Sequence, residues 1–360
     1  MKKIMTIVGA RPQFIKAAMM SRVLKSDYNE VLVHTGQHYD KNMSDVFFDE
    51  LNMSPPDYNL NISGGTHGTM TGRMMISLEE VMLKEKPDMV IVYGDTNSTM
   101  AGALVAVKLG IPVAHIEAGN TRGSLSNPED INRLVSDHTS SILFACVESA
   151  MDVMKKENLS DRAYFVGDSM LDAFLYYSSI TDIKSRTDYT DFDGNRVAIP
   201  DEYYYMTCHR QENAETKGNL LQILLAAQEL DSTVIYAVHP RNRKRVTDIL
   251  KEHKLDNIVF INPVGYLSSV ALMNNAKKVI TDSGGLQREA FFANKQCVTV
   301  FNYAWWPETL HNGMNRLVKP DKNDILEKLS MEAVVDPNYK PFGDGHSCEK
   351  MKEIIDRYFA

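Results

Sequence analysis

Two acidic residues follow predicted strands, at positions from which their side chains could act as an acid and a base. Asp95 follows the apolar run Met89 to Tyr93, and Glu117 follows the next apolar run, Pro112 to Ile116. Such runs are typical of buried parallel strands, whose carboxyl ends share one edge of a sheet. An acidic residue directly after a buried strand must cap a helix, form an ion pair or take part in catalysis, because an isolated buried charge is energetically costly. When two carboxylates lie close together, their pKa values move apart, so one can stay ionised as a base while the other holds a proton as an acid.

Glu129 is a third acid expected at the same rim. It lies in the first turn of a predicted helix, with Asn127 as N-cap and Pro128 at the first helical position. Acids in a first turn are also common because they complement the helix dipole. The position of Glu129 in the first helical turn is therefore equally consistent with a structural role and with a catalytic role.

A strand, a glycine turn and a helix start follow one another around Ser283-Gly284-Gly285. The first amides of a helix have no internal partner, and glycine lets an anion approach the backbone, so this turn suits a phosphate. Ser283 adds a hydroxyl, and Glu289 adds a carboxylate suited to ribose hydroxyls. An ordinary strand-to-helix turn is the alternative interpretation.

Polar donors also follow other predicted strands. His209 and Arg210 come after the strand that begins at Tyr203 and offer two donors for a diphosphate. Single histidines are more often structural, Lys16 could be a solvated helix lysine, and Tyr266 could be core rather than a platform for a base. The candidate anion contacts at these strand ends and turns are Arg11, Lys16, His209, Arg210 and His239.

Composition narrows the class of protein. The chain has 360 residues, 44% of them hydrophobic, which is enough for two cores. A formal net charge of -8 argues against a nucleic-acid protein, whose binding face is normally basic. The N-terminal apolar run is too short for a signal peptide or a membrane span. Its 4 cysteines are too scattered for a disulfide scaffold or a paired zinc signature, so we expect a cytoplasmic protein without a structural metal.

Strands and helices alternate through both halves of the chain, which predicts two open α/β domains. We expect a Rossmann-like domain over 1–168, a second over 169–345, and a closing helix in 346–360 that packs back on the first. The glycine-rich segment 61–72 is expected to be a loop before a helix over 73–84, and 182–201 a surface linker. No G-x-G-x-x-G fingerprint follows the first strand, so NAD chemistry is poorly supported.

A diphosphate site in one domain and carboxylates in the other would suit a nucleotide sugar bound between them. A carboxylate pair beside a phosphate clamp could remove a carbon-bound proton next to the anomeric carbon while the nucleoside diphosphate leaves. Readdition to the other face would invert C2. Cationic His209, Arg210 and Arg11 would then stabilise the leaving diphosphate without a metal.

The chain resembles the non-hydrolysing UDP-N-acetylglucosamine 2-epimerase family over nearly its whole length. The motifs that carry the resemblance are, in order, GARPQFIKAA, TGQHYDKNMSDVFF, THGTMTGRM, YGDTNST, HIEAGN, NPEDINR, CHRQEN, AVHP and TDSGGLQREA. The resemblance implies a glycosyltransferase-B-like fold of two Rossmann-like domains facing across a cleft, no cofactor, and a homodimer. It also implies interconversion of UDP-GlcNAc and UDP-ManNAc through bound 2-acetamidoglucal and UDP, as in surface polysaccharide precursor synthesis.

The family's functional residues map onto this sequence position by position. The resemblance implies catalytic roles for Asp95, Glu117, Glu129 and His209. The implied UDP contacts are Arg11, Lys16, Arg210, His239, Tyr266, Ser283, Gly284, Gly285 and Glu289. Many bacterial members bind a second UDP-GlcNAc as activator, and Gln37 and Arg73 match that second site.

Some motifs depart from the family pattern. The usual Glu-Ala-Gly-Leu-Arg reads Glu117-Ala118-Gly119-Asn120-Thr121 here, which displaces an arginine to Arg122. Several motifs are most similar to the UDP-2,3-diacetamido-glucuronate 2-epimerase subgroup, and EAGN is similar to enzymes of UDP-6-deoxy sugars. Those sugars are therefore alternative substrates. A glycosyltransferase on the same fold, a hydrolysing enzyme and a non-catalytic UDP-sugar sensor are the alternatives in function.

Overall fold

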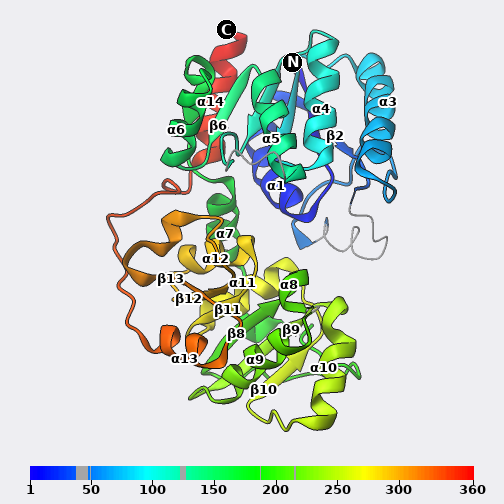
Figure 1. The fold of residues 1–360 in the computed structure, drawn as a ribbon. Coiled ribbons are helices and arrows are strands. Elements are labelled where there is room, and N and C mark those ends of the chain that lie inside the picture. The colour runs from blue at the N-terminus through cyan, green and yellow to red at the C-terminus, as the bar shows by residue number, and fades with distance from the viewer. Residues whose placement is uncertain (38–47, 49, 122–126, 187, 215) are drawn as a thin grey trace. The chain divides into compact units, whose positions relative to one another are not determined.

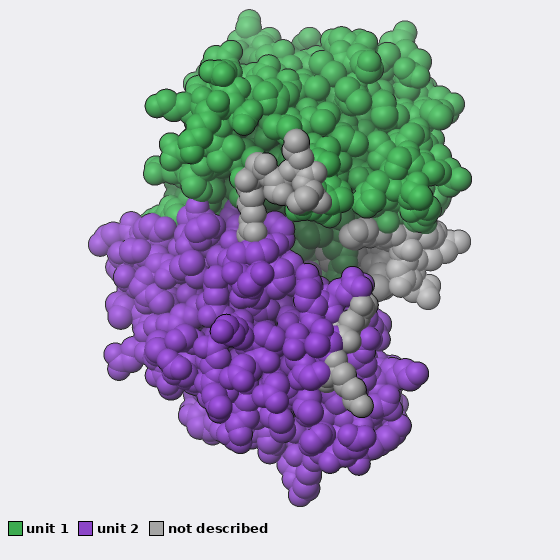
Figure 2. Space-filling model, viewed as in Figure 1, with its two compact units in different colours: residues 1–173, 340–360 green, residues 174–339 purple. Residues whose placement is uncertain are grey.

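A computed structural model describes residues 1–37, 48, 50–121, 127–186, 188–214 and 216–360. The chain forms two compact units, one made of residues 1–173 and 340–360 and the other of residues 174–339 (Figure 2). Helix α7 (Ser169–Ile180) contains the boundary between them. Each unit has its own sheet, so each positions its own set of polar side chains.

The first unit is built on a parallel sheet in which seven strands are described, in the order β3-β2-β1-β4-β5-β6-β7. The order reverses between β1 and β4, which is the switch point where open α/β sheets bind ligands. The strands are β1 (Lys2–Val8), β2 (Tyr28–His34), β3 (Tyr58–Asn59), β4 (Met89–Tyr93), β5 (Val113–Ile116), β6 (Ile142–Ala145) and β7 (Ala163–Phe165).

Helices of the first unit follow the strands and cover the sheet (Figure 1). They are α1 (Arg11–Leu24), α3 (His67–Glu85), α4 (Asn97–Lys108), α5 (Pro128–Thr139), α6 (Glu148–Lys156), the short η1 (Ser160–Arg162) and the C-terminal α14 (Ser347–Phe359). The last of these belongs to the first unit: the Tyr28 hydroxyl donates to Asp356, and the Cys348 amide donates to Asp172.

The second unit repeats the plan with a parallel sheet of six described strands, in the order β10-β9-β8-β11-β12-β13. Its strands are β8 (Tyr203–Cys208), β9 (Thr233–Val238), β10 (Ile258–Ile261), β11 (Val279–Thr281), β12 (Cys297–Val300) and β13 (Asn315–Val318). Its helices are η2 (Ile183–Ser185), α8 (Gln211–Ala214), α9 (Lys217–Gln228), α10 (Pro240–Glu252), α11 (Tyr266–Asn275), α12 (Gly284–Phe292), η3 (Pro307–Gly313) and α13 (Lys322–Ser330). Two parallel α/β sheets confirm the predicted fold class.

The central strands of each sheet are buried on both faces, as their apolar sequences require. All five residues of β4 are buried, and Val90 and Val92 pack in one cluster with Met74, Leu78 and the alanines of α4. In the second unit β8 and β9 pack against Leu220, Leu224 and Ile325. Because the strands are fixed by these contacts, the turns at their carboxyl ends start from rigid positions.

The start of α3 differs from the prediction. We expected a loop over residues 61–72, but the helix begins at His67, because Thr66 caps it by accepting a hydrogen bond from the Thr69 amide at 3.4 Å. The cap outweighs the low helix propensity of Gly68 and Gly72. Among the described helices, none combines the length and the apolar character needed to cross a membrane.

Candidate active site

The Asp95 and Glu117 carboxylates of the first unit lie on one guanidinium. Arg133 Nη2 donates to Asp95 Oδ2 at 2.7 Å and to Glu117 Oε1 at 3.3 Å. Its Nη1 donates to the Glu117 backbone carbonyl as well. The Asp95 side chain is 34% exposed and that of Glu117 only 10%, so Asp95 is the more accessible of the two acids. Asp95 and Glu117, which the strand-end pattern predicted to lie close together, share Arg133 as a partner in the structure.

Two buried cations balance these acids. The Lys16 ammonium from α1 donates to Glu117 Oε2, and both side chains are nearly inaccessible to water. Burial alone would lower the pKa of Arg133, but attraction by Asp95 and Glu117 outweighs it and raises that pKa. Lys16 therefore belongs to the carboxylate cluster rather than to a solvated helix face.

Glu117 has an unusual backbone. Its φ of 72° lies in the left-handed region, which residues with a side chain adopt rarely. The amides of Glu117 and Ala118 both donate to the Phe144 carbonyl, at 3.1 and 3.0 Å, which holds this conformation. Strained backbone that its surroundings enforce is concentrated at functional sites.

Gln13 joins the turn after β1 to the turn after β4. Its Oε1 accepts from the Gly9 and Ala10 amides at 2.7 and 3.0 Å. Its Nε2 donates to the Tyr93 carbonyl at 2.6 Å. A fully satisfied buried amide of this kind rigidifies its surroundings. The turn that carries Asp95 is thus tied to the turn that carries Arg11.

Glu129 and Arg11 lie in the first turns of α5 and α1. Glu129 is exposed in the first turn of α5, and its amide donates to the Asn127 side chain at 3.3 Å. Arg11 is half-buried at the start of α1; burial lowers its pKa, and Glu50 opposes this. Arg122 lies outside the described residues.

Asp282 organises the candidate diphosphate site of the second unit. Its buried carboxylate accepts from the His209 amide at 3.0 Å, the Arg210 amide at 2.9 Å and Asn213 Nδ2 at 3.1 Å. His209 Nδ1 lies 3.2 Å from Asp282 Oδ1. A carboxylate at Nδ1 places the ring proton there and leaves the Nε2 lone pair to accept.

Desolvation lowers the pKa of His209 below its ordinary value of 6.5, and Asp282 only partly opposes this. The ring is therefore mainly neutral at pH 7, so the structure favours hydrogen bonding by His209 over the cationic role expected from the sequence. We predict that activity depending on neutral His209 is present above that pKa and is lost as the pH falls through it.

The test is a pH profile of kcat for the wild type and for His209→Asn, whose side chain does not titrate in this range. An acid limb below pH 6.5 in the wild type, absent from the residual activity of His209→Asn, is the expected result. Activity that rises on acidification below pH 6.5 would show that the imidazolium is the active form.

The turn at Ser283 is the start of α12, as predicted. Ser283 Oγ accepts from the Leu286 amide at 3.2 Å, and Gly285 is exposed. A Cβ at Gly284 would lie 2.9 Å from Trp305 Cδ1, so any larger residue would require the Trp305 side chain to shift. The Arg210 guanidinium lies 5.3 Å from the Trp305 ring centroid. Arg210 and the glycine turn therefore share one aromatic neighbour.

Glu289 and Tyr266 interact with each other. Tyr266 is 6% exposed, and its ring packs edge-on against Tyr177 with centroids 5.6 Å apart. Burial, together with the charge of Glu289, raises the Tyr266 pKa. Because it is buried, Tyr266 presents little ring surface to a base. His239 is exposed at the start of α10, with its ring centroid 6.0 Å from that of His209.

The two residues matched to a second nucleotide site lie in the first unit. Gln37 Oε1 accepts from the Ser98 amide at 3.1 Å and from Ser98 Oγ at 2.7 Å. Arg73 is exposed on α3.

Sequence reasoning missed Arg133, Asp282 and Gln13. Arg133 lies four residues after Glu129, which is about one turn further along the predicted helix. An arginine at this spacing could have been predicted to lie near the acids. Asp282 directly follows a buried strand, the same signal that identified Asp95. Gln13 gave no such signal, because the partners of its Nε2 lie 80 or more positions away in the chain.

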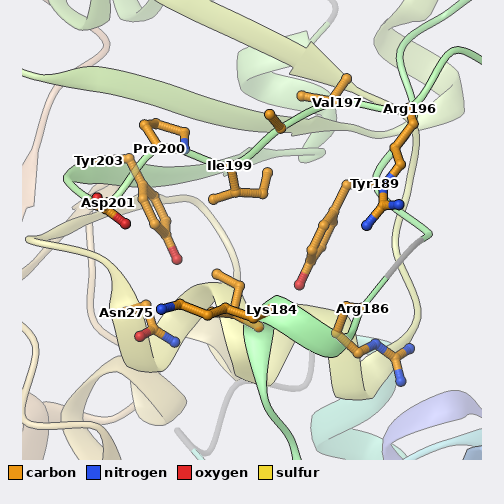
Figure 3. A pocket seen from close by; sticks show the side chains of 12 residues that line it. Lys184, Arg186, Tyr189, Arg196, Val197, Ile199, Pro200, Asp201, Tyr203 and Asn275 are labelled. Atoms are coloured by element: carbon orange, nitrogen blue, oxygen red, sulfur yellow. The ribbon is translucent and has the colours of Figure 1, made fainter.

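A cavity of about 430 Å³ lies elsewhere in the second unit, where the segment before β8 passes α11 (Figure 3). It contains none of the predicted site residues. Its Arg186 donates to Ser268 Oγ at 2.7 Å, and the Tyr189 and Tyr203 hydroxyls donate to backbone carbonyls. These groups are satisfied within the protein, so the cavity is not the candidate site. The described part of the chain also holds no group of three or more potential metal ligands.

Two parallel α/β units, one with a buried carboxylate cluster and one with a glycine turn at a helix start, define a glycosyltransferase-B-like α/β protein. A family model described as UDP-N-acetylglucosamine 2-epimerase matches residues 22–356. The chain belongs to this family, whose members are isomerases. This confirms the resemblance carried by the motifs.

Individual relatives agree over nearly the full length. The chain is 45% identical to a UDP-N-acetylglucosamine 2-epimerase homolog of Methanococcus maripaludis, covering 98% of this chain and 99% of that one. It is 41% identical to a UDP-2,3-diacetamido-2,3-dideoxy-D-glucuronate 2-epimerase of Pseudomonas aeruginosa, covering 98% and 99%. The Methanocaldococcus jannaschii UDP-GlcNAc 2-epimerase, in complex with UDP-GlcNAc and UDP, is similar with a TM-score of 0.84, 38% identity and 99% coverage of both chains.

Proposed function

We propose that this protein interconverts UDP-GlcNAc and UDP-ManNAc. The observation that carries the proposal is the Asp95–Arg133–Glu117 cluster, in which two carboxylates at adjacent strand ends share one guanidinium. Relatives with this activity in their names support it. The proposal assigns the chemistry to this cluster of the first unit and the nucleotide contacts to the His209 and Ser283 turns of the second.

The reaction begins with removal of the C2 proton by a carboxylate of the cluster. The C–H electron pair forms a C1–C2 double bond as the C1–O bond breaks, and UDP leaves with the electron pair of that bond. Readdition of the UDP oxygen to C1 and delivery of a proton to the opposite face of C2 give the epimer. No oxidant or reductant enters this balance, so the proposal needs no redox cofactor.

The residues of the second unit would hold the departing diphosphate. The free amides at the start of α12 and the Arg210 guanidinium suit its negative charge. Neutral His209, with Nε2 as acceptor, suits a proton on a phosphate or sugar oxygen. Glu289 suits the ribose hydroxyls.

A second candidate substrate is UDP-2,3-diacetamido-2,3-dideoxy-glucuronate. It is favoured by the Pseudomonas aeruginosa relative named for that sugar, at 41% identity. The elimination is the same for both sugars, because the groups at C3 and C6 do not take part in it.

Incubation with each UDP-sugar, without any acceptor, tests the proposal. Growth of UDP-ManNAc to a stable ratio with UDP-GlcNAc is expected. Turnover of the diacetamido-glucuronate alone would reassign the substrate, free ManNAc would indicate a hydrolysing enzyme, and dependence on an added acceptor would indicate a glycosyltransferase.

The same proposal includes a homodimer that uses α3. Ile76 and Leu83 are 64% and 58% exposed, and seven residues apart they share one face of the helix. We predict that Ile76→Glu with Leu83→Glu shifts the protein to a monomer in light scattering, since two charges would be buried in the interface. Val334→Glu, at an exposed apolar residue of the other unit, is the control. An unchanged mass in the double variant contradicts this interface.

Other parts of the proposal depend on the activity. We place the protein in the cytoplasm, where the four cysteines, all free and buried here, would stay reduced. We also propose that it supplies a precursor for surface polysaccharide, and that a second UDP-GlcNAc could bind near Gln37 and Arg73 as activator.

A further inference from the structure

We infer that the buried pair His115 and Asp137 positions the catalytic carboxylates, with His115 held as an imidazolium. The inference rests on the proposed function, and it concerns two residues that do not touch the two acids themselves. His115 lies within β5, and Asp137 lies on α5; both are buried, His115 with no exposed surface.

The geometry favours two ring protons on His115. Nδ1 lies 2.7 Å from Asp137 Oδ1, and Nε2 lies 2.7 Å from the backbone carbonyl of Gly94. A carbonyl only accepts, and a carboxylate also accepts, so both nitrogens must donate. An aspartic acid is ordinarily a stronger acid than an imidazolium, so the proton between the two side chains belongs on Nδ1, and the other Asp137 oxygen accepts from the Gly119 amide at 3.0 Å. The pair is a buried imidazolium and carboxylate with every polar atom satisfied.

Each end of the pair holds a turn that carries one acid. The Gly94 carbonyl immediately precedes Asp95, so His115 holds the turn after β4. Gly119 follows Glu117 by two residues, so Asp137 holds the turn after β5. Gly119 has φ 73°, and a Cβ there would lie 2.6 Å from the Ala150 carbonyl oxygen, which shows how closely this turn is packed.

The pair therefore sets the spacing between the two carboxylates. Arg133 holds Asp95 through its side chain and Glu117 through its side chain and its backbone carbonyl, whereas the pair holds the backbone beside both acids. Proton transfer at carbon depends steeply on such spacing, since a misplacement of about 1 Å can cost about 100-fold in rate.

Two substitutions test the positioning role. Asp137→Asn keeps the shape and removes the charge, and His115→Gln keeps a donor near the Nε2 position but loses the one at Nδ1. We expect each to lower kcat by about 100-fold while the KM and the affinity for UDP stay unchanged, because the candidate UDP contacts lie mainly in the other unit. His34→Gln, at another fully buried histidine of the same sheet, is the control for removal of a buried imidazole.

Nitrogen NMR of the wild type tests the charge of the pair without any substitution. Both ring nitrogens of His115 should carry protons at pH 7, and in Asp137→Asn one should lose its proton. An unprotonated ring nitrogen at His115 in the wild type, or full kcat in both folded variants, would overturn the inference. If the wild type did not epimerise any UDP-sugar, the proposed function would fail, while the ring-nitrogen spectrum would still decide the charged pair.

Discussion

Asp95→Asn is expected to abolish turnover while UDP binding stays intact. The amide keeps the size of the side chain and can still accept from Arg133 Nη2, now at 2.7 Å from the carboxylate. It has no basic oxygen for a carbon-bound proton and no acidic proton to return, so we expect a loss of kcat of at least about 1,000-fold. Single-turnover epimerisation together with calorimetry of UDP binding gives both quantities.

The control for this prediction is Asp152→Asn, which removes an exposed carboxylate from the same unit. It should leave kcat unchanged. Full activity in Asp95→Asn would end the assignment of Asp95 to the chemistry, and loss of UDP binding together with kcat would mean a binding role instead.

Arg133→Met is expected to destabilise the first unit as well as to abolish activity. Arg133 is one of the largest fully buried side chains, with 2% of its surface exposed, and it forms ion pairs with both Asp95 and Glu117. Removal of one partner leaves buried charge without compensation, at a cost of about 3 kcal/mol in the free energy of unfolding. Urea unfolding of the isolated variant and of the wild type measures this difference.

Arg133→Lys separates charge from geometry. Lysine restores one positive charge, but it lacks the fork that reaches Asp95, Glu117 and the Glu117 carbonyl at once. We expect most of the stability to return and most of the activity to stay lost. If Arg133→Met unfolded at the same urea concentration as the wild type, the guanidinium would not be the element that holds the two acids.

The parts of the site that follow strand ends could be predicted from the sequence. Apolar runs such as Met89–Tyr93 identify buried strands, so the acids that close them had to lie at one sheet edge. Ser283 was found for the same reason, since a glycine turn after a buried strand begins a helix. The order of the strands was not needed for these predictions.

The groups that hold those acids could not be predicted in the same way. His115 lies inside an apolar strand and reads as a core residue, and its partner Asp137 lies 22 residues further on a helix. Their pairing depends on how α5 packs against β5, which no local pattern encodes. The early start of α3 was missed because glycines suggested a loop where the Thr66 cap decides the structure.

The central claim is that the carboxylate cluster removes the proton from C2 of a UDP-sugar. Its most direct test is incubation with UDP-GlcNAc in heavy water, followed by NMR of the C2 and anomeric protons. We predict loss of the C2 proton signal together with growth of the UDP-ManNAc anomeric signal. A C2 proton that persists in a protein shown to bind UDP-GlcNAc would contradict the claim for this sugar.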